Sequence, residues 1–376
     1  MPAVRRVLVS GAGLAGTATA TGLAAAGVDV DLIEVKPEIT TVGSGITMAG
    51  NGLRELRRLG MLEEVLAAGY PFSDLGLRAP DPAGTLIAEF PDVRTGGADL
   101  PATLGLPRPV LARIMADHAV AAGAKLRFGV SASALAQDES GVDVTFSDGS
   151  AGRYDLVVGA DGIRSATRRM IGIAEEPRST GMGIFRAFVP RPASVTRTDL
   201  YYGGPAYIAG YCPTGQDTLY AYLVEDATDR SALIPEERLA AMRALARHYH
   251  GPWDDIRATL TDPSVISYTL FESLLVPAPW NRGRVVLIGD AAHACPPTLA
   301  QGGSQALEDA AVLTELLLNR DAPGDALWAE FTARRFERAK TVVEASCQLG
   351  QWQLDHVQGD LPGLMASIHE LVSQPA

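Results

Sequence analysis

Residues 7–16 read Val7-Leu8-Val9-Ser10-Gly11-Ala12-Gly13-Leu14-Ala15-Gly16. The apolar run at their start predicts a strand, and the Gly-x-Gly-x-x-Gly segment predicts a tight turn that opens a helix of small residues ending near Ala26. A second apolar stretch, residues 28–34, predicts the next strand and ends in Glu34. Strand, glycine turn, helix and strand in this order indicate a βαβ unit with a parallel sheet.

The glycine turn has the spacing that nucleotide binding requires. Gly11 allows the tight turn, Gly13 lets a pyrophosphate approach the backbone, and Gly16 lets the helix pack closely on the strand. The helix that follows presents free N–H groups to the phosphates. Glu34 follows Gly11 by 23 residues, where a carboxylate accepts hydrogen bonds from an adenosine ribose. The alternative is that the glycines only serve a tight turn.

The composition is that of a folded protein without affinity for nucleic acid. The chain has 376 residues, of which 47% are hydrophobic and 20% charged, enough to bury the cores of about two domains. A formal net charge of −12 repels phosphate backbones, which argues against nucleic-acid partners. The three cysteines, Cys212, Cys295 and Cys347, are far apart and predict neither disulfides nor a metal site. We therefore expect a cytoplasmic protein.

One segment imitates a signal peptide or a membrane span. Residues 7–28 carry no charge and follow Arg5 and Arg6. Their five glycines and low content of large apolar residues argue against insertion into lipid. No other segment reaches the roughly 18 apolar residues of a spanning helix. A monomer or homodimer without membrane attachment is expected.

Up to residue 180, helical and strand-like segments alternate. Residues 51–66 predict two short helices broken at Gly60, and residues 108–122 predict a longer helix. Residues 80–107 are rich in Pro, Gly and Asp and predict loops around short strands. Further strands are predicted at residues 125–128, 132–137, 142–146 and 154–158.

Residues 181–275 carry a different pattern, mostly of strands. These are predicted at residues 184–189, 200–202, 206–211, 218–224 and 265–271. They surround a single predicted helix at residues 235–249. From this run of strands we expect a second, mostly antiparallel layer. An apolar strand ending in Asp290 and a helix at residues 302–318 then return the chain to the first domain.

Two more strands end in an acidic residue, and these carry a resemblance to a family. Residues 158–165 read Val158-Gly159-Ala160-Asp161-Gly162-Ile163-Arg164-Ser165. Residues 289–293 read Gly289-Asp290-Ala291-Ala292-His293, with Gln301-Gly302-Gly303 beyond them. With the glycine turn, these motifs resemble the FAD-dependent aromatic hydroxylases, the single-component flavoprotein monooxygenases of the 4-hydroxybenzoate hydroxylase type. The resemblance covers almost the whole chain.

The resemblance implies a mixed α/β fold with a discontinuous FAD-binding domain. A Rossmann-like domain would comprise residues 1–180 and 276–376, including C-terminal helices. Residues 181–275 would be the inserted antiparallel sheet that binds the substrate.

The flavin would be held at three places along the chain. Asp290 can hydrogen-bond the ribityl hydroxyls, and the helix opened by Gln301-Gly302-Gly303 points its free N–H groups at the flavin N1/C2 carbonyl edge. The resemblance adds Arg108, which reaches the flavin, and Val130, whose backbone meets the adenine. The expected cofactor-binding residues are Gly11, Gly13, Leu14, Ala15, Gly16, Glu34, Ser44, Gly45, Arg108, Val130, Asp161, Gly289, Asp290, Gly302 and Gly303.

Structural alternatives stay open for several of these side chains. Asp161 and Asp290 are also explained as strand-end caps, and Arg108 as a surface residue at a helix start. His293 has the pKa range of a general base, but the resemblance places it beside the motif and away from the reacting atom, so we expect a structural role.

The reaction implied by the resemblance has two halves. NAD(P)H reduces FAD, and O2 then forms a flavin C4a-hydroperoxide that hydroxylates a small or medium aromatic substrate. Only one dinucleotide fingerprint is present, so NAD(P)H would dock transiently. Alternatives are a Baeyer–Villiger or epoxidising monooxygenase of the same fold and a non-catalytic flavin-binding protein.

The substrate is expected to contact the inserted sheet. Four tyrosines at alternate spacing predict an aromatic wall, although a sheet core explains them equally well. Residues 206–212 carry no arginine, which argues against a carboxylate clamp there. We assign catalytic contact to Pro297, Tyr211 and Tyr220, and substrate binding to Arg186, Tyr207 and Tyr222.

Overall fold

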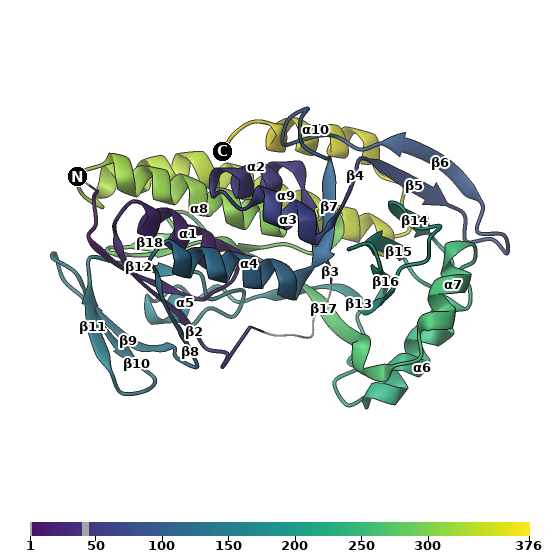
Figure 1. The fold of residues 1–376 in the computed structure, drawn as a ribbon, viewed down its shortest axis with the longest axis horizontal. Helices are drawn as coiled ribbons and strands as arrows, with labels where there is room; N and C mark the ends of the chain where they lie inside the picture. The colour runs from purple at the N-terminus through teal and green to yellow at the C-terminus, as the bar shows by residue number, and fades with distance from the viewer. Residues whose placement is uncertain (1, 40–44) are drawn as a thin grey trace.

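The computed structural model describes residues 2–39 and 45–376. Its first layer is a six-stranded sheet in the order β18-β19-β12-β1-β2-β8 (Figure 1). The strands are β1 (Arg6–Ser10), β2 (Asp29–Glu34), β8 (Lys125–Phe128), β12 (Leu156–Gly159), β18 (Asn281–Arg282) and β19 (Val285–Leu287). All neighbours are parallel except the β18–β19 pair at the edge.

The predicted βαβ unit lies at the centre of this sheet. Strand β1 lies between β2 and β12, with Val9 paired to Leu32 on one side and Val158 on the other. Helix α1 (Leu14–Ala25) connects β1 to β2 and packs against α8 and α4. Strand β1 is apolar on both faces because helices or other strands cover both faces of the sheet.

A second large sheet of eight strands forms the other half of the molecule, on the right of Figure 1. Its order is β20-β17-β13-β16-β15-β14-β5-β6. All neighbours are antiparallel except the parallel β14–β5 pair. The strands are β5 (Asp74–Arg78), β6 (Leu86–Pro91), β13 (Arg178–Pro190), β14 (Thr198–Tyr202), β15 (Ile208–Pro213), β16 (Thr218–Asp226), β17 (Ile266–Leu275) and β20 (His293–Ala294).

This sheet extends beyond the predicted insertion. Strands β5 and β6 come from residues 74–91, and β20 comes from the segment after Asp290. The chain pattern alone did not reveal these pairings, because a strand's partner depends on tertiary contacts. The predicted boundaries of the inserted domain, residues 181 and 275, therefore remain a prediction, because strands from outside this range belong to the same sheet.

Two three-stranded sheets complete the strand content of the described chain. One, on the left of Figure 1, contains β9 (Ala132–Gln137), β10 (Val142–Phe146) and β11 (Ala151–Tyr154). The other contains β3 (Gly45–Ala49), β7 (Thr103–Pro107) and β4 (Tyr70–Phe72), and lies between the two large sheets.

The predicted helix pair is confirmed, with Gly60 in a left-handed conformation at φ +73° between α2 (Gly50–Arg58) and α3 (Leu62–Ala68).

The prediction of a single helix within residues 181–275 is wrong, because α6 (Pro235–Ala246) is followed by α7 (Pro252–Thr259). Gly251, also left-handed at φ +71°, separates them. The other helices are α4 (Arg108–Ala121), α5 (Ala166–Met170), α8 (Gly302–Asn319), α9 (Asp325–Leu354) and α10 (Leu361–Ser373).

The two faces of the eight-stranded sheet have different coverings. Helices α6 and α7 cover the back face through Met242 and Trp253, together with Tyr249 of the connection between them, and all three are fully buried. The front face turns toward the six-stranded half and contacts helix α9 through Leu354. The front face therefore meets the region where the cofactor motifs gather.

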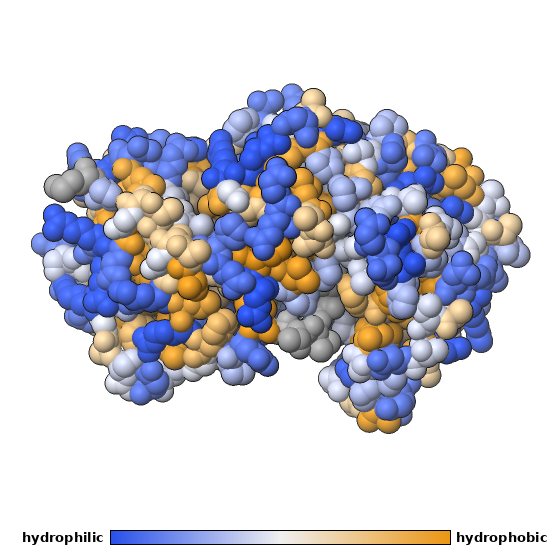
Figure 2. Space-filling view, in the orientation of Figure 1, coloured by the Kyte–Doolittle hydropathy of each residue, from blue (hydrophilic) through white to orange (hydrophobic). Residues whose placement is uncertain are grey.

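The surface is mostly hydrophilic in the view of Figure 2, with apolar residues in smaller separate patches. Within residues 2–39 and 45–376, no helix has both the length and the apolar character needed to cross a bilayer.

Candidate active site

The glycine turn has the geometry predicted for it. Gly11 has φ +105°, and a Cβ there would lie 2.4 Å from the carbonyl oxygen of Ala160. A Cβ on Gly16 would lie 1.9 Å from the carbonyl oxygen of Gly11. A Cβ on Gly13 would meet no atom within 4 Å, so this backbone borders open space. The cradle thus fits a pyrophosphate that approaches Gly13 and the N-terminal residues of α1, Leu14 and Ala15.

Glu34 ends strand β2 beside this turn. Its carboxylate accepts the Ala12 N–H at 3.0 Å and the Lys36 N–H at 3.0 Å, so it is oriented by the backbone. The Val130 N–H donates to the Glu34 carbonyl oxygen at 3.0 Å. The residues expected to meet the ribose and the adenine are therefore neighbours.

Asp161 lies next to the glycine turn but uses its carboxylate within its own segment. It accepts hydrogen bonds from the hydroxyl of Ser165 and from the N–H and hydroxyl of Thr167, the latter two both at 2.9 Å. The Asp161 Cα would lie 2.8 Å from a Cβ on Gly11, so its backbone supports the turn. The geometry favours the structural alternative for this side chain over direct contact with FAD.

Asp290 is placed differently from Asp161. Its side chain is exposed, and within the described part of the chain its carboxylate has no hydrogen-bond or ion-pair partner. Surrounding protein nevertheless desolvates it and raises its pKa, while His293 and Arg108 act in the opposite direction. An accessible carboxylate enclosed by protein is suited to bind ligand hydroxyls.

The turn before Asp290 packs against the glycine-turn helix. Gly289 has φ +58°, and a Cβ there would lie 3.1 Å from that of Ala15. The loop continues through Pro297, which is exposed, to helix α8. No side chain of residues 2–39 or 45–376 caps α8, so N–H groups near Gly302 and Gly303 are available to an acceptor.

Arg108 begins helix α4 directly after strand β7 and is exposed. Its charge acts to lower the pKa of both Asp290 and Tyr220, so it lies near both. Gly45 joins the same region, since a Cβ there would lie 2.6 Å from the Tyr220 Cβ. Ser44, the other predicted residue of that loop, lies outside the described residues.

The front face of the large sheet adds Tyr220 and Tyr222, which form an aromatic wall, and one cation, Arg186. The rings of Tyr220 and Tyr222 on β16 have centroids 5.2 Å apart. Arg186, opposite Tyr222 in the β13–β16 pairing, donates from Nε to the Tyr220 hydroxyl at 2.9 Å and also bonds the Thr269 hydroxyl. Burial raises the pKa of Tyr220, and Arg186 partly offsets this rise.

Tyr211 does not belong to this wall, so the prediction that it lines the ring pocket with Tyr220 is wrong. It is 1% exposed on the back face, and its hydroxyl donates to Asp199 at 2.7 Å. Asp199 also binds Arg78 at 2.6 Å. Successive residues of a strand face opposite ways. Because Tyr211 pairs with Ala221, the neighbour of Tyr220, Tyr211 and Tyr220 lie on opposite faces of the sheet.

Tyr207 lies at the border of the wall, and Tyr202 is a member that the sequence reasoning missed. The Tyr207 hydroxyl donates to Asp226 at 2.6 Å, which raises its pKa to about 12. Tyr202 on β14 is 42% exposed, yet surrounding protein desolvates it and raises its pKa. Its position on the front face follows from its alternation with Tyr201, which lies in the back-face core.

His293 is buried and takes no part in this wall. Its Nε2 lies 2.6 Å from Asp309 Oδ2, and its ring stacks on Trp280 at 5.0 Å between centroids. This placement agrees with the expected structural role.

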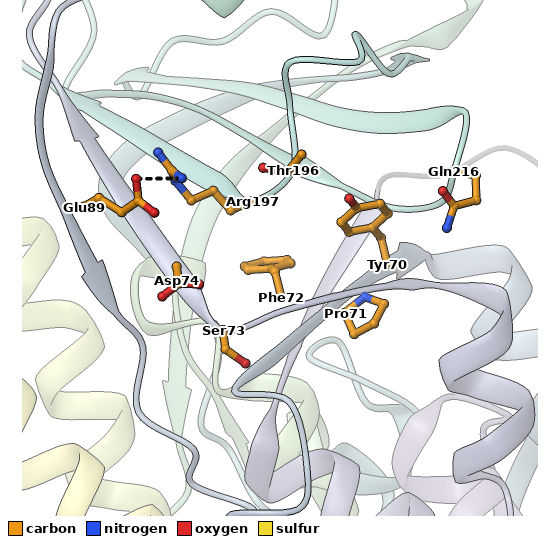
Figure 3. Close-up of a pocket in the computed structure, with 9 residues that line it drawn as sticks. All are labelled: Tyr70, Pro71, Phe72, Ser73, Asp74, Glu89, Thr196, Arg197 and Gln216. Carbon is orange, nitrogen blue, oxygen red and sulfur yellow. Dashed lines mark ion pairs between the residues drawn. The ribbon is translucent and has the colours of Figure 1, made fainter.

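A separate cavity of about 430 Å³ opens near strand β4 (Figure 3). Figure 3 shows the rings of Tyr70 and Phe72 beside an ion pair of Glu89 with Arg197. None of the predicted site residues lines it. Phe72, however, also packs against Tyr220, so this cavity lies behind one edge of the wall.

Comparison with known proteins agrees with this geometry. The family described as FAD binding domain matches residues 5–346. The 2-heptyl-3-hydroxy-4(1H)-quinolone synthase of Pseudomonas aeruginosa is 33% identical, covering 92% of this chain and 90% of the relative. The 6-hydroxynicotinate 3-monooxygenase of Bordetella bronchiseptica is 31% identical, covering 90% of each. HpxO of Klebsiella pneumoniae, complexed with FAD and uric acid, superposes with a TM-score of 0.83 at 23% identity, covering 98% of this chain and 92% of that one.

The fold and the three converging motifs define a flavoprotein with a Rossmann-like cofactor domain. The chain belongs to the FAD binding domain family and is an FAD-dependent monooxygenase of the aromatic hydroxylase type.

Proposed function

We propose that the protein uses NAD(P)H and O2 to hydroxylate a small or medium aromatic substrate whose ring carries an oxygen substituent. The supporting observation is the Arg186–Tyr220 pair on the front face, near Arg108, whose charge also acts on Asp290. Since Arg186 donates to the Tyr220 oxygen, the Tyr220 O–H remains free to donate to a substrate oxygen. The names of both relatives above also specify rings with oxygen substituents.

Each part of the site has one task in this reaction. FAD, when bound, would supply the activation of O2, and O2 is the source of the oxygen atom that enters the ring. Glu34, Asp290 and the starts of helices α1 and α8 bind and orient the cofactor. Tyr202, Tyr222 and Pro297 enclose the substrate ring and exclude water. Tyr220, supported by Arg186, holds the ring oxygen and so orients the carbon that reacts.

The overall reaction balances as substrate, O2, NAD(P)H and a proton giving hydroxylated product, NAD(P)+ and water. A transient NAD(P)H contact is proposed because the chain has only one dinucleotide fingerprint. A cytoplasmic location with an NAD(P)H supply and a monomeric or homodimeric state are parts of the same proposal.

A substrate panel tests the proposal. Purified protein with FAD is mixed with NADH or NADPH and with 6-hydroxynicotinate, a hydroxyquinolone, an aminohydroxybenzoate or urate. We expect at least one compound to accelerate NAD(P)H oxidation and to gain the mass of one oxygen on a ring carbon. Ring expansion or an epoxide would assign the alternative monooxygenase reactions. No accelerated oxidation with any oxygen-bearing ring, including wider panels, would contradict the proposal.

A further inference from the structure

Two adjacent carboxylates on helix α8, Glu308 and Asp309, are fully buried and bind arginines of helix α9. Arg335 donates from Nε to Asp309 at 2.7 Å and from Nη1 to Glu308 at 2.8 Å. Arg338 donates from Nε and Nη2 to Glu308 at 2.7 and 2.9 Å. Buried ions are stable only while they keep their partners. The positions of these four side chains are therefore interdependent.

Asp309 connects this cluster to the turn that carries Asp290. Its Oδ2 accepts the Gly289 N–H at 2.8 Å and lies 2.6 Å from His293 Nε2. Although burial raises the pKa of Asp309, His293 and Arg335 outweigh it and hold this pKa at about 2. The charged carboxylate fixes the chain on both sides of Asp290.

Glu308 connects the same cluster to the start of helix α8. The Asn51 amide donates to Glu308 Oε1 at 2.9 Å and to Gln301 Oε1 at 3.0 Å. Gln301 directly precedes Gly302 and Gly303, where the helix N–H groups are available to the flavin. A shift of Glu308 would therefore move Asn51 and, through it, Gln301 at the start of helix α8.

The end of helix α10 closes the cluster from the opposite side. Arg338 donates to the carbonyls of Leu371 and Gln374 at 2.6 and 3.0 Å. Arg54 donates to the carbonyls of Ser373 and Gln374 at 3.1 and 3.2 Å. The last carbonyls of a helix have no partners within the helix and carry its negative dipole end. Arg54 also pairs with the Glu308 carboxylate at 3.8 Å.

We propose that the end of helix α10 is a positioning element for FAD. Its carbonyls hold Arg338 and Arg54 against Glu308, and Glu308 with Asp309 holds both flavin-binding segments, residues 289–293 and 301–303. Binding of FAD and docking of the α10 end are then thermodynamically linked, so each stabilises the other. The proposal concerns retention of the cofactor and does not depend on which substrate is oxidised.

A purely structural role for the cluster makes a different prediction. If the cluster had only that role, its disruption would lower the free energy of unfolding, but the folded holoprotein would still release FAD at the wild-type rate. The measurement that separates the two is FAD release from folded holoprotein on dilution, followed by the recovery of flavin fluorescence. Amide hydrogen exchange of residues 365–376 with and without FAD reports the linkage directly.

The test compares Arg338→Gln with the matched control Arg334→Gln. Arg334 also binds a carbonyl near the chain end, that of Ala376 at 2.7 Å, but its carboxylate partner is Glu315 on the surface. We expect Arg338→Gln to release FAD about five- to fiftyfold faster and Arg334→Gln to behave as wild type. FAD should slow exchange of residues 365–376 in wild type and lose this effect in Arg338→Gln.

A milder variant keeps the test decisive if Arg338→Gln does not fold. Asn51→Ala leaves every ion pair of the cluster in place. It removes the link from Glu308 to Gln301 and a long hydrogen bond from the Thr95 hydroxyl at 3.4 Å. It should release FAD several-fold faster from the folded holoprotein, with a loss of thermal stability smaller than that of Arg338→Gln, because it removes neutral donors and no buried charge. The proposal is overturned if a folded Arg338→Gln or Asn51→Ala releases FAD at the wild-type rate, if Arg334→Gln releases it equally fast, or if FAD leaves exchange at the α10 end unchanged in wild type.

Discussion

The glycine turn and the tyrosine-bearing sheet differ in the groups that they offer to a ligand. The turn offers backbone groups, and its glycines are required because a Cβ on Gly16 would lie 1.9 Å from a carbonyl oxygen. The sheet offers side chains, and the face on which a residue lies decides whether it can take part in the proposed site. Tyr220 lies on the front face with Arg186, whereas Tyr211, of the same residue type, is a core residue on the back face. Spacing in the sequence is therefore enough to predict the conformation of the turn, but not to predict which tyrosines lie on the front face of the sheet.

The largest effect is expected at the turn, from Gly16→Ala compared with Gly13→Ala. The first forces a methyl group into the Gly11 carbonyl and should destabilise the apo-protein by about 3 kcal/mol. The second meets no protein atom within 4 Å and should cost less than about 1 kcal/mol of stability while still weakening FAD binding. Thermal unfolding and FAD titration of both variants provide the measurement. Equal stability losses would contradict the two roles.

Asp290→Ala should produce the next largest effect, on cofactor affinity. Loss of a charge-assisted hydrogen bond to the flavin side chain is expected to cost about 1.5–3 kcal/mol, a ten- to hundredfold rise in the Kd of FAD. Asp161→Ala is the control, because among the residues that the structure describes its carboxylate binds only Ser165 and Thr167. It should lower the thermal stability and leave FAD affinity unchanged. The reverse result would exchange the roles of the two aspartates.

Tyr211→Phe and Tyr220→Phe test the two faces of the sheet. Tyr211→Phe removes the hydrogen bond to buried Asp199 and should cost about 1–2 kcal/mol of stability. The coupling, meaning the hydroxylated product formed per NAD(P)H consumed, should not change. Tyr220→Phe should keep the fold and FAD content but lower hydroxylated product per NAD(P)H several-fold, because the substrate is misplaced. Product and hydrogen peroxide are measured together for each variant. Coupling that is unchanged in Tyr220→Phe would make this tyrosine a core residue as well.

The smallest effect is expected from Tyr202→Phe. The side chain is 42% exposed and its hydroxyl is available to a substrate, so its loss should raise the substrate KM about two- to fivefold. Stability should stay within about 0.5 kcal/mol of wild type, since the hydroxyl is not needed by the core. A KM equal to that of wild type would place Tyr202 outside the substrate site.

Local rules predicted the elements whose stability depends on local geometry. Gly60 separates two helices because it adopts a left-handed conformation, and this was evident from the sequence. The second helix of the inserted region, α7, was missed: the predicted helix ended at residue 249, and the eight residues of α7 are too few to give a clear helical pattern. Strand β6 was expected only as one of the short strands among loops in residues 80–107, and β5 was not predicted. Their place in the large sheet depends on the pairing of β5 with β14.

The cofactor motifs and the monooxygenase family were determined by the sequence alone. A glycine turn, an acidic residue at the end of the next strand and two further strand-end motifs depend on backbone conformation and on spacing along the chain, which a sequence states directly. Only the tertiary structure decided that Asp161 caps its own helix, that Tyr211 faces the core, that Tyr202 joins the wall, and that helix α10 reaches the cluster behind Asp290. These depend on strand pairing and on contacts between residues far apart in the chain. Such contacts exist only once the whole chain has folded.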